Sequence, residues 1–152
     1  MLTQTVGRPM EILLVEDDLV QARLAAEAIR RGAFRHRTTL VGDGQEALDF
    51  LCRRGIFRQA PRPDLILLDL RLPKMDGLDV LAEIQADDHL KTIPVVIMTA
   101  SEDEQDRTIC QRHNVQAYMT KPVDLEKFLA LLKQLKRFWQ ADMMLPPELV
   151  QS

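Results

Sequence analysis

A run of four apolar residues at 65–68 constrains the fold of this chain more than any other feature. Pro63 and Asp64 precede the run, and Asp69 follows it directly. A short apolar run between turn residues is typical of a strand buried on both faces of a sheet. We therefore expect the Asp69 carboxylate at the carboxyl end of this strand, the edge where ligands bind in open α/β sheets. The chain then turns into a helix that begins near Leu78.

Strand-like and helix-like segments alternate along most of the chain. Four more segments have the composition of strands: 12–15, 36–41, 94–98 and 115–119. Segments with one apolar helical face separate them and follow the last one. Five strands alternating with five helices predict an α/β fold, in which a parallel sheet is covered by helices on both faces and joined by right-handed crossovers.

The apolar faces of three helices define much of the predicted core. In the first helix, which ends before Gly32, the expected core-facing residues are Val20, Leu24, Ala28 and Ile29. In the second they are Ala47, Leu48, Leu51 and Cys52. Asp124 is expected to cap the last helix, whose apolar face carries Leu125, Phe128, Leu132, Leu135 and Trp139. The segment 102–113 is acidic at its start, which suits the amino end of a further helix.

Length and charge limit the class of protein. A chain of 152 residues fits a single domain. Its 20 basic and 23 acidic residues give a net charge of −3, which argues against a sequence-independent grip on nucleic acid. The leading segment lacks an apolar core and no run is long enough to span a membrane, so we expect a cytoplasmic protein with no membrane partner.

We expect Cys52 and Cys110 to be buried free thiols, with a disulfide as the alternative.

Charged and hydroxyl residues end the predicted strands at one edge of the sheet. They are Glu16, Asp17, Asp69, Thr99 and Lys121. Two like charges about 4 Å apart repel by roughly 4 kcal/mol at an effective dielectric of about 20, so protons or a cation must relieve three clustered carboxylates. Oxygen ligands without nearby His or Cys favour a hard divalent ion such as Mg²⁺. The sequence therefore predicts a metal site.

The same edge has the groups that phosphoryl transfer needs. A metal ion, the Lys121 ammonium and the Thr99 hydroxyl would match the equatorial oxygens of a phosphoryl group. Asp69 would then be the nucleophile, because carboxylates can form aspartyl-phosphates. Each residue alone also has an ordinary structural explanation; either Asp17 or Asp18, for example, could simply cap the following helix. Their combination at successive strand ends is what indicates a site.

Four motifs contain these strand ends: ILLVEDD, LILLDLRLPKMDG, VVIMTAS and YMTKP. Over roughly residues 10–137 they resemble the receiver domain of two-component response regulators. The resemblance implies a flavodoxin-like, doubly wound fold with strand order 2-1-3-4-5. It also implies phosphotransfer from the histidine of a sensor kinase to Asp69, dependent on Mg²⁺ or Mn²⁺. A receiver of this kind is a phosphoacceptor and not an enzyme, beyond catalysing its own phosphorylation and dephosphorylation.

The resemblance also implies a role for each site residue. Glu16 and Asp17 match the family's acidic pair at the metal site, where Asp17 and Asp69 would bind the ion through their carboxylates and Arg71 through its backbone carbonyl. Thr99 and Lys121 match the switch hydroxyl and lysine. Tyr118 matches the aromatic residue that rotates as the hydroxyl shifts, and the bond between Lys121 and Pro122 is expected to be cis. An arginine at residue 71 departs from the family's more usual asparagine.

Three segments lie outside or between the common elements. Residues 1–9 are expected to be a loose lead, and 138–152 a C-terminal extension, too short for a helix-turn-helix module, so output is expected through protein contact. The extension is rich in apolar residues: Phe138, Trp139, Met143, Met144 and Leu145. They predict a homodimer through the last helix and the extension, with exchange of tail arms between protomers as a variant. The alternative is that Trp139 folds back onto the core of its own chain. The connection 53–62, with four arginines, is expected to be a solvated loop or, alternatively, a docking surface for an acidic partner. This connection and the extension resemble single-domain regulators that partner bacterial phytochrome histidine kinases.

Three other functional classes can be compared with the sequence. A haloacid-dehalogenase-type phosphohydrolase also uses an aspartate at a strand end, but it needs a second aspartate two residues later, where this chain has Arg71. A flavin-binding flavodoxin is disfavoured because the acidic residues 16–18 would repel phosphate. The remaining alternative is a receiver-like scaffold that dimerises and never takes a phosphoryl group.

Overall fold

A five-stranded parallel sheet in the order β2-β1-β3-β4-β5 forms the centre of the computed structural model. The structure describes residues 8–32, 35–100, 108, 111–113, 115 and 117–135. The strands are β1 Met10–Val15, β2 His36–Val41, β3 Leu65–Asp69, β4 Val95–Thr99 and β5 Ala117–Thr120. Every residue of β1, β3 and β4 is buried, as continuous apolar runs require in a sheet covered on both faces. The predicted fold class and strand order are confirmed.

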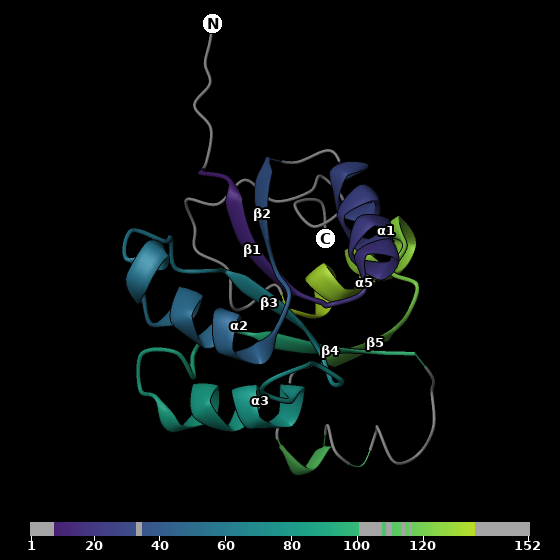
Figure 1. Cartoon of the computed structure of the whole chain (residues 1–152). Coiled ribbons are helices and arrows are strands. Elements are labelled where there is room, and N and C mark those ends of the chain that lie inside the picture. The colour runs from purple at the N-terminus through teal and green to yellow at the C-terminus, as the bar shows by residue number, and fades with distance from the viewer. Residues whose placement is uncertain are drawn as a thin grey trace, which may run out of the picture.

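Helices cover both faces of the sheet (Figure 1). Helices α1, Leu19–Arg30, and α5, Leu125–Gln134, lie on one face, and α2, Gly44–Leu51, and α3, Gly77–Ala86, lie on the other. Each face has its own apolar core, one around Ile29 and Phe128 and the other around Leu48 and Leu81. Most of the segment 102–113, for which we predicted a further helix, lies outside the described residues.

Aspartate side chains cap three of these helices. Asp18 accepts hydrogen bonds from the backbone N–H groups of Val20 and Gln21, at 2.9 and 3.2 Å. Asp43 caps α2 in the same manner, and Asp124 caps α5 as predicted. The capping role that was open to either Asp17 or Asp18 therefore belongs to Asp18.

The predicted core face of α1 is wrong at two positions. Val20 is 66% exposed and Leu24 is 44% exposed. The buried residues of this helix are Ala22, Ala25, Ala28 and Ile29. Alanines let a helix backbone approach the sheet closely, so α1 packs through small side chains together with Ile29, while Leu19, Val20 and Leu24 face solvent.

Cys52 is free, as predicted, but its predicted burial is wrong because its side chain is exposed. Helix α2 ends at Leu51, so Cys52 caps the helix and leaves its apolar face, while Phe50 and Leu51 fill the core. Cys110 lies outside the described residues. The following connection is mostly exposed but not wholly irregular: it contains a 3-10 turn, Gly55–Phe57, whose Phe57 ring packs edge-on against Phe50 with 5.4 Å between centroids.

The remaining predictions concern membrane-spanning helices and the two ends of the chain. No helix within the described ranges is long and apolar enough to cross a bilayer. The lead up to residue 7 and the extension with Phe138, Trp139, Met143 and Leu145 lie outside those ranges.

Candidate functional site

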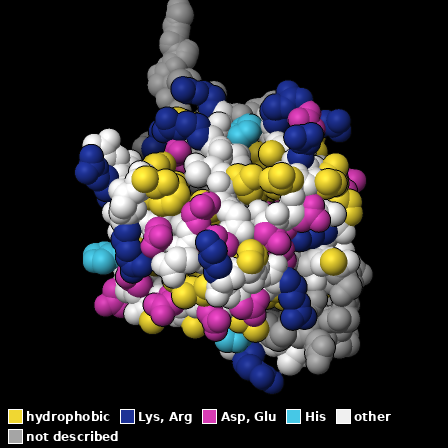
Figure 2. Space-filling model, in the orientation of Figure 1, with side chains coloured by type: hydrophobic (Ala, Val, Ile, Leu, Met, Phe, Trp, Pro, Cys, Tyr) yellow, Lys and Arg dark blue, Asp and Glu magenta, His cyan; other side chains and the backbone are white. Residues whose placement is uncertain are grey.

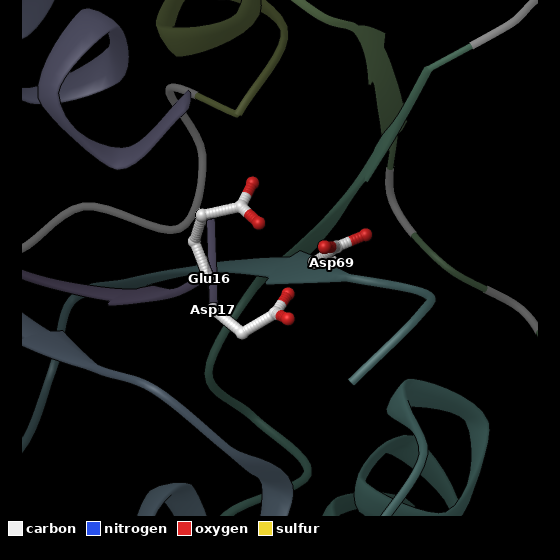
Figure 3. A group of neighbouring side chains, drawn as sticks. All are labelled: Glu16, Asp17 and Asp69. Atoms are coloured by element: carbon white, nitrogen blue, oxygen red, sulfur yellow. The ribbon is translucent and has the colours of Figure 1, made fainter. Parts of the chain in front are cut away.

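The parallel sheet brings the predicted site residues to one edge. Glu16 and Asp17 follow β1, and Asp69 is the last residue of β3. Because β1 and β3 are hydrogen-bonded neighbours, these side chains emerge next to each other, as Figure 3 shows. One oxygen from each of the three carboxylates lies within 4.8 Å of the others. The gathering of carboxylates that the sequence predicted is confirmed.

The three carboxylates differ in their exposure to water. Glu16 is 2% exposed and Asp69 is 5% exposed, whereas Asp17 is exposed at the rim. Charge on the two buried groups is therefore poorly screened, while the rim stays open to an entering ligand.

Lys121, which follows β5, connects the two buried carboxylates. Its Nζ lies 2.5 Å from Oε1 of Glu16 and 3.1 Å from Oδ2 of Asp69. Its backbone N–H donates to the Thr99 carbonyl at 2.7 Å, and its peptide bond to Pro122 is cis, as the resemblance implied. Thr99, the last residue of β4, is 5% exposed. The ends of β4 and β5 therefore complete the site on the side opposite Asp17.

Burial and the contacts of Lys121 together set the protonation of Glu16 and Lys121. Burial raises the pKa of the Glu16 carboxyl to about 7; the hydrogen bond from Lys121 acts against this, and the neighbouring Asp69 adds to it. For Lys121, burial works to lower the pKa, but the hydrogen bonds to Glu16 and Asp69 outweigh it and the pKa is raised overall. The ammonium of Lys121 thus contacts two of the three clustered carboxylates, and the negative charge of the cluster favours a cation.

The donor set fits Mg²⁺ or Mn²⁺. The three clustered side chains offer only oxygen ligands, and neither His nor Cys belongs to this described cluster. Hard divalent ions prefer such ligands and Mg²⁺ needs only one or two carboxylates beside water. The backbone N–H of Arg71 donates to Oδ1 of Asp69 at 3.2 Å, so the chain turns back toward the carboxylate there. The Arg71 carbonyl stays a predicted ligand.

Two glycines that the sequence analysis did not single out set the shape of the loop after β3. A Cβ on Gly77 would lie 2.2 Å from the Asp69 carbonyl oxygen, so α3 can begin this close to the end of β3 only at a glycine. A Cβ on Gly44 would lie 2.0 Å from the Met75 carbonyl oxygen, so α2 presses directly on the same loop. The Met-Asp-Gly turn at 75–77 was a signal for the first of these contacts.

The surroundings of the site also include a backbone hydrogen bond from Asp18 and the aromatic side chain of Tyr118. The backbone N–H of Asp18 donates to Oε2 of Glu16 at 3.2 Å, which holds the buried carboxylate from the α1 side. Tyr118 on β5 is half-buried and packs against the apolar core on the face of the sheet that α2 and α3 cover. Its predicted rotation stays a prediction.

Known proteins resemble this chain along almost its whole length. The family model described as the response regulator receiver domain matches residues 12–133. Response regulator Rcp1 from Synechocystis sp. is 40% identical over 138 residues, which covers 91% of this chain and 94% of that protein.

Solved structures agree with the sequence comparison. The crystal structure of the Mn²⁺-bound form of Rcp1 has a TM-score of 0.72 at 40% identity and covers 91% of this chain and 99% of that one. The crystal structure of a phosphorylated cyanobacterial phytochrome response regulator, RcpA, has a TM-score of 0.74 at 40% identity, with 92% and 99% covered. The fold, the acidic cluster and these matches lead to one conclusion: the chain belongs to the response regulator receiver domain family.

Proposed function

We propose that Asp69 accepts a phosphoryl group from the histidine of a sensor kinase, in a step that requires Mg²⁺ or Mn²⁺. The observation that carries the proposal is the buried Asp69 carboxylate, which contacts Lys121 and lies among two further carboxylates at the open edge of the sheet. A carboxylate in this setting is a nucleophile with its counter-charges already in place.

In the proposed step an Asp69 carboxylate oxygen forms a bond to phosphorus as the bond between phosphorus and the donor nitrogen breaks. The electron pair of the broken bond stays on the histidine ring, which takes up a proton. Glu16, Asp17, Asp69 and the Arg71 carbonyl would hold the divalent ion, which supplies positive charge to the phosphoryl oxygens. Lys121 already contacts Asp69 and would follow the negative charge onto the new acyl phosphate.

The proposed response is a shift between two states of the chain. The Thr99 hydroxyl and Lys121 would be drawn toward the phosphoryl group, and Tyr118 would move with Thr99. A ligand shifts such an equilibrium only by its differential interaction with the two states, and here the phosphoryl oxygens provide that difference.

The kinase partner is proposed to be a phytochrome. Rcp1 and RcpA are similar over more than nine-tenths of the chain, and RcpA is described as a phytochrome response regulator. A surface beside the site suits a protein donor: Leu19 is 72% exposed and Val20 is 66% exposed, at the start of α1 and directly after the acidic residues. Figure 2 shows apolar side chains over β2 and α1 on this face. A protein that delivers a phosphoryl group to the rim would cover them.

Output is proposed to go through protein contact, from a cytoplasmic protein without nucleic-acid or membrane partners. The dimer would form through α5 and the extension 138–152, with Phe138, Trp139, Met143 and Leu145 at the interface. The net charge of −3 supports a partner other than nucleic acid.

The competing function is a dimerising scaffold that never takes phosphate. Transfer from an autophosphorylated phytochrome kinase to this chain distinguishes the two. We expect label on the wild-type chain in the presence of Mg²⁺ and none on Asp69→Asn. A folded wild-type chain that takes no label from any histidine kinase or small phosphodonor would favour the scaffold.

A further inference from the structure

A concave site lies at the opposite end of the sheet from Asp69. A cavity of about 470 Å³ opens between the end of α2, residues 62–63 and the connection from α3 to β4. Leu51 and Leu90, each 8% exposed, contribute apolar surface, and the side chains of Arg53 and Arg62 also line it. Small-molecule sites have volumes of about 300–1,000 Å³ and combine apolar surface with a few polar groups.

Hydrogen bonds to the connection between α3 and β4 hold the Arg62 side chain in place. Its Nη2 donates to the His89 carbonyl at 3.1 Å and to Oγ1 of Thr92 at 2.7 Å. Both bonds use the same nitrogen, so Nη1 and Nε make no hydrogen bond within the described part of the chain. The guanidinium is therefore oriented while most of its donors stay available.

Arg53 occupies a backbone position that favours glycine. Its φ is +58°, and it directly follows the cap residue of α2. The N–H of Arg54 donates to the Asp49 carbonyl at 2.8 Å and the N–H of Arg53 donates to the Phe50 carbonyl at 3.2 Å, the pattern that ends helices with a left-handed residue. Glycine adopts this conformation without the steric cost that an arginine incurs. An arginine at residue 53 therefore carries a conformational cost in the backbone that a glycine would avoid.

The charge at this cavity favours an anion. Within the residues that the structure describes, the Arg53 guanidinium forms no ion pair, whereas Arg54 pairs with Asp49 at 3.4 Å. The acidic side chain that lines the cavity, Asp88, is paired with Lys91 at 2.9 Å. Two guanidinium groups consequently face the cavity with little opposing charge.

We propose that this cavity binds a small multivalent oxyanion, a polycarboxylate or a phosphate ester, between Arg53 and Arg62. The planar fork of a guanidinium matches two oxygens of a carboxylate or phosphate, and two forks across one cavity select for more than one anionic group. The site is remote from the carboxylate cluster and does not depend on phosphoryl transfer at Asp69.

The test is a calorimetric titration of the full chain with citrate and with inorganic phosphate, without divalent ions. We expect saturable binding of at least one of these probes, weakened at least tenfold in Arg53→Gly and in Arg62→Gln. We expect Arg53→Gly to melt at a higher temperature than the wild type, because glycine relieves the backbone strain. Binding loss with a gain in stability is an outcome that misfolding cannot produce.

Arg58→Ala is the matched control, since Arg58 is an exposed arginine of the same connection and does not line the cavity. It should bind both probes as the wild type does. The proposal is overturned by an absence of saturable binding to the wild type, by an equal loss in Arg58→Ala, or by an Arg53→Gly chain that is less stable. Binding of a glutamate-rich peptide but of neither free anion would also overturn it, in favour of a docking surface for an acidic protein.

Discussion

The Nζ atom of Lys121 lies 2.5 Å from Oε1 of Glu16, and both side chains are almost fully shielded from water. The same ammonium lies 3.1 Å from Asp69, so a single charge is shared by the two buried carboxylates of the site. A divalent ion bound to this cluster would compete with Lys121 for these oxygens. Metal binding and the position of Lys121 are therefore coupled.

Replacement of Lys121 by methionine should separate metal binding from phosphorylation. The ammonium repels a bound Mg²⁺, and the loss of a net repulsion on the order of 1–2 kcal/mol should tighten Mg²⁺ binding roughly tenfold. The same variant should be phosphorylated more slowly, because the charge beside Asp69 is gone. Titration with Mg²⁺ and the rate of phosphorylation measure the two effects. Lys133→Met, at an exposed position of α5, is the control and should change neither.

The pH dependence of stability should carry the signature of Glu16. Its pKa is raised to about 7 in the folded chain by burial, so the folded state holds a proton that the unfolded chain releases at lower pH. Without metal, its contribution to the free energy of unfolding is therefore largest below its ordinary pKa and falls as the pH rises toward 7. Mg²⁺ requires the ionised carboxylate, so its affinity should increase over the same range. Denaturant unfolding from pH 5 to 8, with and without Mg²⁺, measures both trends.

Glu16→Gln provides the comparison for this pH dependence. The amide does not titrate, so the fall in stability toward pH 7 should flatten. An unchanged pH profile in Glu16→Gln would assign the titration to another group.

Two neighbouring aspartates should respond in opposite ways to replacement by alanine. Asp18→Ala removes the cap of α1 and should lower the free energy of unfolding by about 1 kcal/mol while Mg²⁺ binding persists. Asp17→Ala removes an exposed carboxylate of the cluster and should weaken Mg²⁺ binding at least tenfold with little loss of stability. Thermal unfolding and metal titration of both variants check this. The reverse pattern would mean that the two roles are exchanged.

The exposed apolar residues at the start of α1 should affect the rate of phosphorylation only when the donor is a protein. Val20→Asp places a charge in the apolar surface beside the site and should slow transfer from a histidine kinase about tenfold or more. Phosphorylation by a small acyl phosphate should not change, because that donor needs no docking surface. Ile56→Asp is the control: Ile56 is 92% exposed but lies in the connection after α2, across the sheet from α1. Equal losses with both donors would instead indicate damage to the site.

Sequence patterns were sufficient for the sheet but not for the packing of each helix. The apolar runs that end in Asp69 and Thr99 predict buried strands because they are short and turn residues precede them. The phase of α1 was wrong because large apolar residues were favoured over Ala22 and Ala25, although small residues permit the closer contact. The burial of Cys52 was wrong because it depends on where α2 ends, and one residue decides that.

The site was predictable as far as topology determines it. Strand ends on one edge bring Glu16, Asp17 and Asp69 together whatever their side chains do. The bridge from Lys121 to Glu16 was not predictable, because it depends on side-chain distances and not on strand order. The contacts of Gly44 and Gly77 were missed because a glycine shows its importance only through what a Cβ would meet.

The most direct test of the account is the intact mass of the chain after incubation with a small acyl phosphate, with and without Mg²⁺, beside the Asp69→Asn variant. Circular dichroism first establishes that both chains are folded. We expect one phosphoryl group on the wild type, which requires Mg²⁺, and none on Asp69→Asn. Full labelling of the folded Asp69→Asn chain would contradict it, and so would a folded wild-type chain that gains no phosphoryl group under any condition.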